Sequence, residues 1–295
     1  MAELTRRPAD AGWLARAPSA ALVIGGITSV QIGGALAVHL FAWVGPGGAV
    51  ALRMVTAALV LLAISPPRLR GRALQGLPIA VVFGLVLAGM TLSFYNALHR
   101  VPLGIAVSLE FIGPLTVAVA GSRRPLDVLW VALAVTGIVA LTRGGGEPIS
   151  ALGVFFALLA GGLWGCYILL SARVGRAFER GAGLTVALCV ASLVTVPVGV
   201  ATAGSHLVEP RSLALGAAVG ILSSAIPFSF EMEALRRIAA SLFGVLMSLE
   251  PAMAALAGFV ILGQQLSARA VLGIALVMAA SVGASLRARR VATDI

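Results

Sequence analysis

The sequence predicts an all-α membrane protein with ten transmembrane helices in two inverted five-helix repeats. Three observations support this fold class: the apolar composition, the length of the apolar segments and an internal repeat. Of the 295 residues, 60% are hydrophobic and 11% are charged, and the mean hydropathy is +1.05. A soluble domain of this size would need more polar surface than such a composition provides.

Ten apolar runs of at least about 18 residues are each long enough to cross the hydrocarbon core of a bilayer, which is about 30 Å thick. Turn-forming residues separate several of them, at 45–48, 65–67 and 144–148. The predicted spans are residues 20–41, 47–65, 77–98, 101–120, 127–143, 151–172, 183–204, 212–232, 240–262 and 268–286.

An internal repeat relates the two halves of the chain at a separation of 137 residues. The matching residues are Ala97, Leu98, Arg100, Pro114, Ala118 and Gly121, which recur as Ala234, Leu235, Arg237, Pro251, Ala255 and Gly258. Five spans in each copy turn the second copy upside down, a construction found in many secondary transporters. We therefore predict a tail at 1–19, a first repeat at 20–145, a second repeat at 151–286 and a second tail at 287–295.

The distribution of arginine predicts the orientation of the chain. There is no lysine, and sixteen of the 21 arginines fall on one side of the predicted bilayer and four on the other, with Arg53 inside a span. Positive charge collects on the cytoplasmic side of a membrane, so both termini are expected in the cytoplasm. The same clustering accounts for the net charge of +10 without a nucleic-acid partner.

Two glutamates lie near the centre of predicted spans. Inserting an ionisable side chain at the bilayer centre costs about 2.5–3.5 kcal/mol, so each of them requires a functional or structural explanation. Glu110 is the tenth residue of its span and Glu250 the eleventh of its own, which places both about 15 Å deep, near the bilayer midplane. We expect the two carboxylates to face each other across the centre of the protein. The alternative is that a structural partner neutralises each of them.

Prolines follow both glutamates in the sequence. Pro114 has no N–H group, so the carbonyl of Glu110 lacks its helical partner, and Pro251 frees the carbonyl of Met247 in the same way. Broken helices that expose carbonyls in the membrane are tolerated where they line protein or a water-filled cavity. Both prolines are also compatible with simple packing kinks.

Arg53 and Glu231 complete the predicted substrate and proton site, and six further residues are weaker candidates. Arg53 is the intramembrane cation, and it is suited either to a substrate carboxylate or to a structural salt bridge with Glu110. Glu231 lies near the predicted inner gate, whereas Glu233 beside it is better explained by charge balance with nearby arginines. Six polar or aromatic residues are candidates for the pocket wall or for packing: Gln31, Ser93, Tyr95, Asn96, Trp164 and Tyr167.

These groups suit a small zwitterion, which needs a carboxylate for its ammonium and a cation for its own carboxylate. One buried glutamate that holds a proton in one state and an amine in the next would give proton antiport. No catalytic motif and no Cys or His cluster with metal-ligand spacing occurs, so we expect no enzyme activity, metal or cofactor. A passive channel is the alternative to a proton-driven transporter. The sequence does not determine the oligomeric state.

Several runs resemble the bacterial threonine/homoserine exporters within the EamA-type drug/metabolite transporter superfamily. They are VPLGIAV at 101–107, LEF at 109–111 with GPL at 113–115, SRRP at 122–125 with Asp127, LSSA at 222–225 with Pro227, Glu231-Met232, and LMS at 246–248 with EPA at 250–252. The resemblance implies ten helices around a central pocket, a location in the bacterial inner (plasma) membrane and proton-driven efflux of small neutral amino acids. Other solutes of the superfamily, such as aromatic amino acids, cysteine-pathway metabolites or cationic drugs, are the alternatives. One departure is Gln264, where the superfamily often has Glu.

Overall fold

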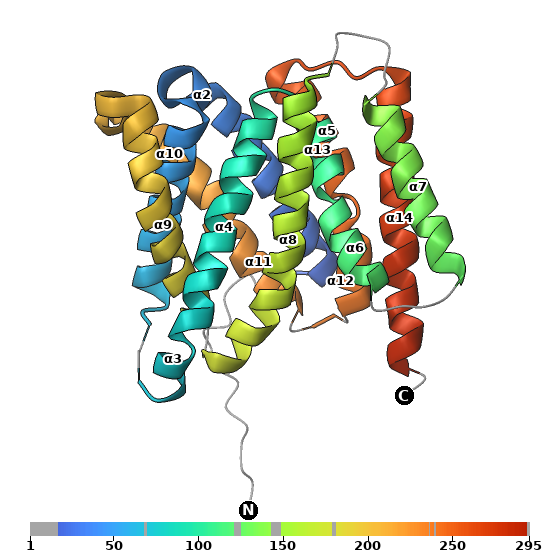
Figure 1. Ribbon diagram of the computed structural model, residues 1–295, viewed down its shortest axis with the longest axis horizontal. Helices are drawn as coiled ribbons and strands as arrows, with labels where there is room; N and C mark the ends of the chain where they lie inside the picture. The colour runs from blue at the N-terminus through green and yellow to red at the C-terminus, as the bar shows by residue number, and fades with distance from the viewer. Residues whose placement is uncertain are drawn as a thin grey trace, which may run out of the picture.

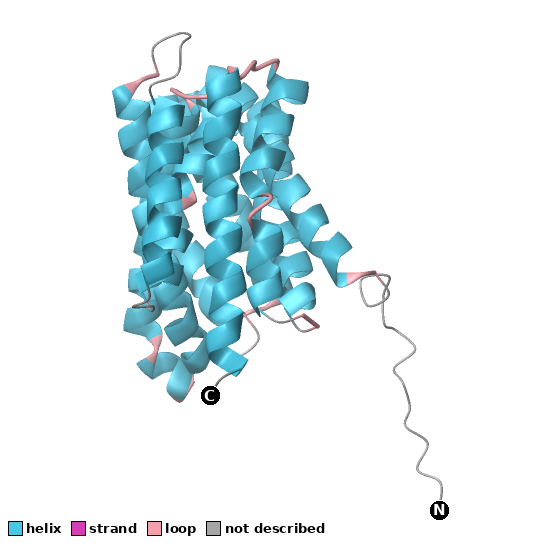
Figure 2. Ribbon diagram, turned by 90° about the vertical axis from the view of Figure 1, so that its right-hand side faces the viewer, coloured by secondary structure: helices cyan, strands magenta, loops and turns pink. Residues whose placement is uncertain are grey.

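A computed structural model describes residues 17–67, 70–120, 125–142, 149–178, 181–235, 237–238 and 240–293. Within these ranges all regular secondary structure is helical, and the long helices run side by side as one bundle (Figures 1 and 2). The predicted tail up to residue 16 and the predicted linker at 143–148 lie outside the described residues.

The helices are α2 (Ser19–Ile64), α3 (Arg72–Gln75), α4 (Leu77–Leu98), α5 (Leu103–Glu110), α6 (Ile112–Ala120), α7 (Pro125–Thr142), α8 (Ala151–Ala177), α9 (Ala182–Ala203), α10 (Pro210–Gly220), α11 (Ile226–Leu235), α12 (Ala240–Met247), α13 (Glu250–Leu262) and α14 (Ala268–Thr293). A 3-10 helix, η1 (Gly204–Val208), follows α9, and a π-helix, η2 (Ile221–Ala225), joins α10 to α11. Because α14 extends to Thr293, helix continues into the range predicted as the second tail.

Seven helical segments in the described part of the chain are long and apolar enough to cross a membrane, and two shorter apolar helices accompany them. One of the seven, α2, has 46 residues, which would span about 69 Å as a straight helix. It is interrupted at Gly45, whose φ of 65° and ψ of 175° are not helical, and Pro46 follows. The two predicted spans 20–41 and 47–65 lie on either side of this kink.

Three of the predicted spans consist of more than one helix. Span 101–120 comprises α5 and α6, span 212–232 comprises α10, η2 and most of α11, and span 240–262 comprises α12 and α13. A proline lies within one turn after each interruption: Pro114, Pro227 and Pro251. The missing N–H groups explain why regular α-helix does not continue through these points.

The outer face of the bundle is apolar, as a surface in contact with lipid requires. Leu193 is 75% exposed, Val260 69% and Phe259 60%, although each has a large hydrophobic side chain. The interior contains leucine, alanine and glycine together with buried polar groups. The chain is thus a multi-pass helical membrane protein, and its interior is where polar side chains gather.

Glycines set the closest helix contacts. α7 packs along α14 where Gly137 faces Gly273. A Cβ atom on either glycine would lie 2.9 Å from the carbonyl oxygen of the other. Small residues that let helix backbones approach are typical of membrane bundles.

Candidate functional site

The two predicted midplane glutamates flank the breaks in two helices that pack together. Glu110 is the last residue of α5, Glu250 is the first residue of α13, and each is only 8% exposed. α5 and α13 touch closely at Gly104, where an added Cβ would lie 2.8 Å from the Cα atom of Ala255. Glu110 lies within electrostatic range of both Glu250 and Arg53.

The two glutamates are not equivalent positions of the repeat. At a separation of 137 residues, the counterpart of Glu110 is Met247 and the counterpart of Glu250 is Gly113. Glu110 therefore precedes its helix break, whereas Glu250 follows its own. An acid at the start of a helix is stabilised by the helix dipole, and one at the end of a helix is not.

Gln31 from α2 holds the Glu250 carboxylate. Its Nε2 donates a hydrogen bond of 3.1 Å to Oε1 of Glu250, and both side chains are buried. The other carboxylate oxygen, Oε2, is buried and has no hydrogen-bond partner in the part of the chain that the structure describes. Gln31, predicted as a weaker pocket residue, thus directly contacts a principal one.

Arg53 projects from the second half of α2 toward α4 and η2. Its guanidinium donates to the backbone carbonyl of Ser223 over 3.1 Å and lies 5.5 Å from the centre of the Tyr95 ring. A longer contact of 3.4 Å joins it to the Tyr95 hydroxyl. Its Nε, like Oγ of Ser223, is buried without a partner among the described residues. No salt bridge between Arg53 and Glu110 occurs within the 4.0 Å limit in that part of the chain.

The π-helix η2 supplies acceptors that the sequence analysis did not identify. Pro227 has no N–H group to donate back to the carbonyls of Leu222 and Ser223. These carbonyls instead accept hydrogen bonds from Ser29, over 2.7 Å, and from Arg53. A proline in the middle of an apolar span was the available signal, and the same reasoning that singled out Pro114 and Pro251 would have found it.

The break beside Pro114 is held against α8. Gly161 lies so close that a Cβ atom there would be 2.6 Å from the carbonyl oxygen of Glu110, the carbonyl freed by Pro114. Gly113 is packed against the same residue, with its own Cβ position 1.8 Å from the Gly161 oxygen. Gly161 is therefore the contact residue of α8 for this break.

A cavity of about 440 Å³ is lined in part by residues from the C-terminal halves of α8 and α14. These two helices end at the same end of the bundle (Figure 1). Its lining residues are Phe111, Pro114, Leu115, Trp164, Tyr167, Ile168, Ser171, Glu231, Phe243, Gly244, Met247, Ser281, Ala284 and Ser285. Among them Glu231 is the one charged side chain. Four predicted residues thus share one cavity: Pro114, Trp164, Tyr167 and Glu231.

The aromatic residues of the cavity are held by neighbouring rings. Trp164 meets Phe111 edge to face at 5.5 Å, and Tyr167 stacks on Phe83 at 4.8 Å. Glu231 lies within electrostatic range of Tyr167 and of Glu250. The cavity therefore adjoins the buried acidic cluster, although neither Glu110 nor Glu250 is among its lining residues.

Two predicted pocket residues lie apart from this cavity. Asn96 is near the C-terminal end of α4, away from the cavity, and its backbone and side-chain oxygens accept hydrogen bonds from Arg100. Ser93 is buried in α4, one turn before it. Neither residue lines the 440 Å³ cavity.

Gln264, the departure from the superfamily pattern, has a structural contact. Its Oε1 accepts a hydrogen bond of 3.0 Å from the backbone N–H of Leu103, the first residue of α5. The Gln264 side chain packs against Gly258 of α13, where an added Cβ atom would be 2.6 Å from the same Oε1 atom. Gln264 therefore joins α5 to α13 at the end of the bundle away from the cavity.

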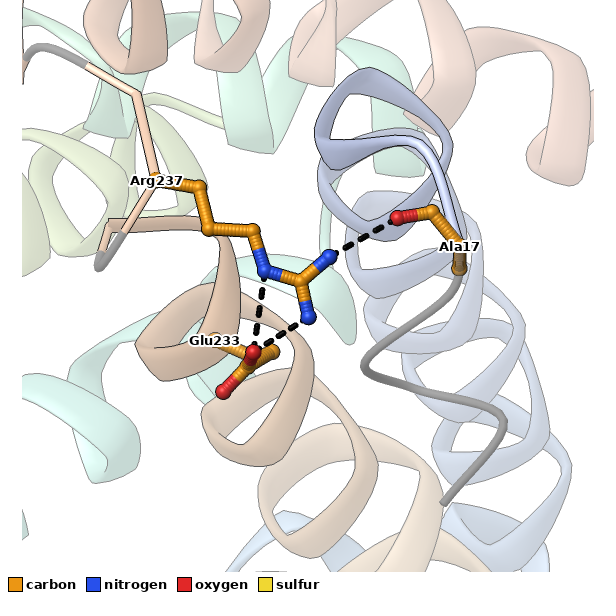
Figure 3. A network of polar contacts seen from close by, with 3 residues as sticks. All are labelled: Ala17, Glu233 and Arg237. Atoms are coloured by element: carbon orange, nitrogen blue, oxygen red, sulfur yellow. Dashed lines mark hydrogen bonds and ion pairs between the residues drawn. The ribbon is translucent and has the colours of Figure 1, made fainter. Parts of the chain in front are cut away.

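At the other end, Glu233 is part of a local network. Arg237 donates to its carboxylate from both Nε and Nη2, and donates from Nη1 to the carbonyl of Ala17 over 3.0 Å (Figure 3). This ion pair confirms the expected charge balance for Glu233. In the described ranges, no group of three or more His, Cys, Asp or Glu is placed to hold a metal ion.

Comparisons with known proteins point to one family. The EamA-like transporter family matches over residues 151–286. The threonine/homoserine exporter RhtA of Salmonella typhimurium (strain SL1344) is 44% identical over 268 residues, which cover 90% of each protein. RhtA of Escherichia coli (strain K12) is 43% identical over the same length. A protein of known crystal structure shares the fold, with a TM-score of 0.61 at 20% identity, covering 92% of this chain and 98% of that one.

The family is one of transporters and not of enzymes. Because the similarity to the exporters extends over 90% of both chains at 44% identity, it is not confined to one repeat or one motif. The chain belongs to the EamA-like transporter family.

Proposed function

We propose that this protein exports threonine, homoserine and similar small neutral amino acids across the bacterial inner membrane by proton antiport. The observation that carries the proposal is the 44% identity, over 90% of both chains, to a threonine/homoserine exporter. The acidic cluster of buried Glu110 and Glu250 with half-buried Glu231 supports the choice of protons as the driving ion. Ionisable groups inside a membrane commonly mark proton and substrate pathways.

The proposal includes ten spans in two inverted repeats, with both termini in the cytoplasm. Helix packing supports it, because several of the main contacts have a counterpart when the two halves are exchanged. α4 packs on α8, and correspondingly α10 and α11 pack on α2. α5 packs on α13, α7 on α14, and the second half of α2 on α9. In this orientation, the cavity beside Glu231 lies in the cytoplasmic half of the protein.

Proton-driven export is tested in proteoliposomes loaded with radiolabelled threonine. We expect efflux to accelerate when the outside is made acidic, and unlabelled homoserine to compete. Glu110→Gln should transport with an altered pH dependence. Flux that is independent of the proton gradient would indicate a passive channel, and unchanged pH dependence in Glu110→Gln would remove that residue from the exchange mechanism.

One observation favours a second candidate, export of a larger solute of the same superfamily. The cavity volume of about 440 Å³ and its aromatic walls lie in the range typical of sites for drug-sized ligands. A panel of aromatic amino acids and organic cations in the same proteoliposomes distinguishes the two. Threonine competing better than every member of the panel would support the first proposal.

A further inference from the structure

The acidic cluster contains two kinds of carboxylate. Glu231 lines the cavity, whereas Glu250 is not among its lining residues, is only 8% exposed and is held by Gln31. The two are nevertheless within electrostatic range of each other. Glu231 is therefore accessible from the cavity and Glu250 is not, but the charge of one affects the charge state of the other.

We propose that substrate and proton use different carboxylates: Glu231 binds the substrate ammonium in the cavity, and Glu250 carries the proton. This assignment rests on the antiport function proposed above and specifies which residue performs each step. It replaces competition for one carboxylate with electrostatic coupling between two.

The cavity has the chemistry of an ammonium site at Glu231. Glu231 is the one charge among its described lining residues, and the aromatic rings of Trp164 and Tyr167 line the same space. A cation is attracted both by a carboxylate and by the faces of aromatic rings. The hydroxyl group of Ser285 lines the same space and can meet the polar part of an amino acid, whereas the Ser281 hydroxyl is 2.7 Å from Oγ of Ser248.

Glu250 suits a proton better than an ammonium. The ionised form is stabilised by the Gln31 N–H and by the N-terminus of α13, where Glu250 is the first residue. The neutral form is favoured because Oε2 is buried without a partner among the described residues, and an unpaired buried charge is costly. Glu250 therefore has a physical basis for both its ionised and its neutral form. A proton, unlike a substrate ammonium group, can bind there without a cavity.

The charge of Glu231 acts electrostatically on Glu250. The charged groups near it are Glu231 on α11 and Glu110 on α5, while Arg53 on α2 lies within range of Glu110. An ammonium bound at Glu231 cancels one negative charge, which favours the step from the neutral acid of Glu250 to carboxylate plus a proton released to solvent. Linkage is reciprocal, so a proton on Glu250 weakens ammonium binding by the same factor, typically about 5- to 150-fold.

Proton release on substrate binding tests the assignment. The full-length protein in detergent is titrated with L-threonine in weak buffer, with binding followed by calorimetry and released protons by a pH indicator. Wild type should release up to about one proton per threonine bound. Glu250→Gln, which mimics the protonated acid, should still bind, with a Kd weakened by no more than about 150-fold, and release no proton. Glu231→Gln should lose more than about tenfold in affinity, since a charge-assisted contact to the ammonium is removed.

Glu233→Gln is the matched control for Glu231→Gln. It lies two residues along the same helix, outside the cavity lining, and should bind and release protons like wild type. Proton release by Glu250→Gln, loss of threonine binding in folded Glu250→Gln, or unchanged affinity in Glu231→Gln would each overturn the assignment.

A second variant covers the case in which Glu250→Gln does not fold. Gln31→Leu keeps both carboxylates but removes the N–H donor to Glu250. Threonine should still bind, and the midpoint of proton release should move to higher pH because the ionised form has lost its donor; an unchanged midpoint would overturn the assignment. Wild-type binding without proton release would instead refute antiport, and absence of threonine binding would refute the proposed substrate.

Discussion

Gly161 lies where α8 comes closest to the break between α5 and α6. The backbone carbonyl that Pro114 deprives of its partner is 2.6 Å from the position of a Cβ atom on Gly161. Its neighbour Gly162 has no atom within 4 Å of the equivalent position, leaving aside its own helix backbone and adjacent residues. Two adjacent residues of the same type therefore have different roles, and the difference depends on the facing helix.

This pair gives a prediction at the residue scale. Gly161→Ala must push α8 away from Glu110, and forcing extra atoms into packed helices costs about 1–3 kcal/mol. We expect a lower thermal unfolding temperature in detergent. Gly162→Ala should be neutral or slightly stabilising, because alanine is favoured over glycine in a helix by up to about 1 kcal/mol. Equal effects of the two substitutions would contradict the packing described here.

At the scale of the element, the segment from α10 through η2 to α11 is irregular for an identifiable reason. Pro227 leaves two carbonyls without helical donors, and Ser29 and Arg53 on α2 bind them. The π-helix thus fixes the position of the intramembrane cation, much as the breaks beside Glu110 and Glu250 fix the acids. All three interruptions place polar backbone next to buried charged side chains.

Pro227→Ala tests this arrangement. The new N–H group competes for the carbonyl bound by Arg53, so the segment should become regular α-helix and the protein should be no less stable. A hydrogen bond to a charged group is worth about 1.5–3 kcal/mol, so we expect threonine export to slow by about tenfold or more. The measurements are thermal unfolding and proteoliposome efflux.

Pro197→Ala in α9 is the control, since Pro197 also lies inside a helix but near the outward-facing Leu193. It should leave export unchanged. Wild-type efflux by Pro227→Ala would show that the π-helix does not position Arg53 for transport.

At the scale of the whole molecule, the bundle has an apolar exterior and an asymmetric interior. The cavity lies toward one end, near the ends of α8 and α14, while Gln264 joins α5 to α13 toward the other. Transport by alternating access would require the contacts at the Gln264 end to open when the cavity closes.

The proposed orientation makes a prediction for the whole molecule. In a background in which both native cysteines are replaced by serine, Ser205→Cys in η1 and Arg176→Cys at the end of α8 place exposed thiols at opposite ends of the bundle (Figure 1). A membrane-impermeant maleimide should label Ser205→Cys in intact cells and label Arg176→Cys only after permeabilisation. The reverse pattern would invert the proposed topology.

Hydropathy, turn residues and proline act locally along the chain, so the kind of protein, its apolar helical segments and the two glutamates inside them could be predicted from the sequence. It did not reveal the π-helix, nor the division of the candidate residues between the cavity and the Glu110–Glu250 cluster. Gln31 and Glu250 are 219 residues apart in sequence, and Arg53 and Ser223 are 170 apart. Only the packing of distant helices brings such pairs together, so which carboxylate lines the cavity and which is buried could not be read from local patterns in the chain.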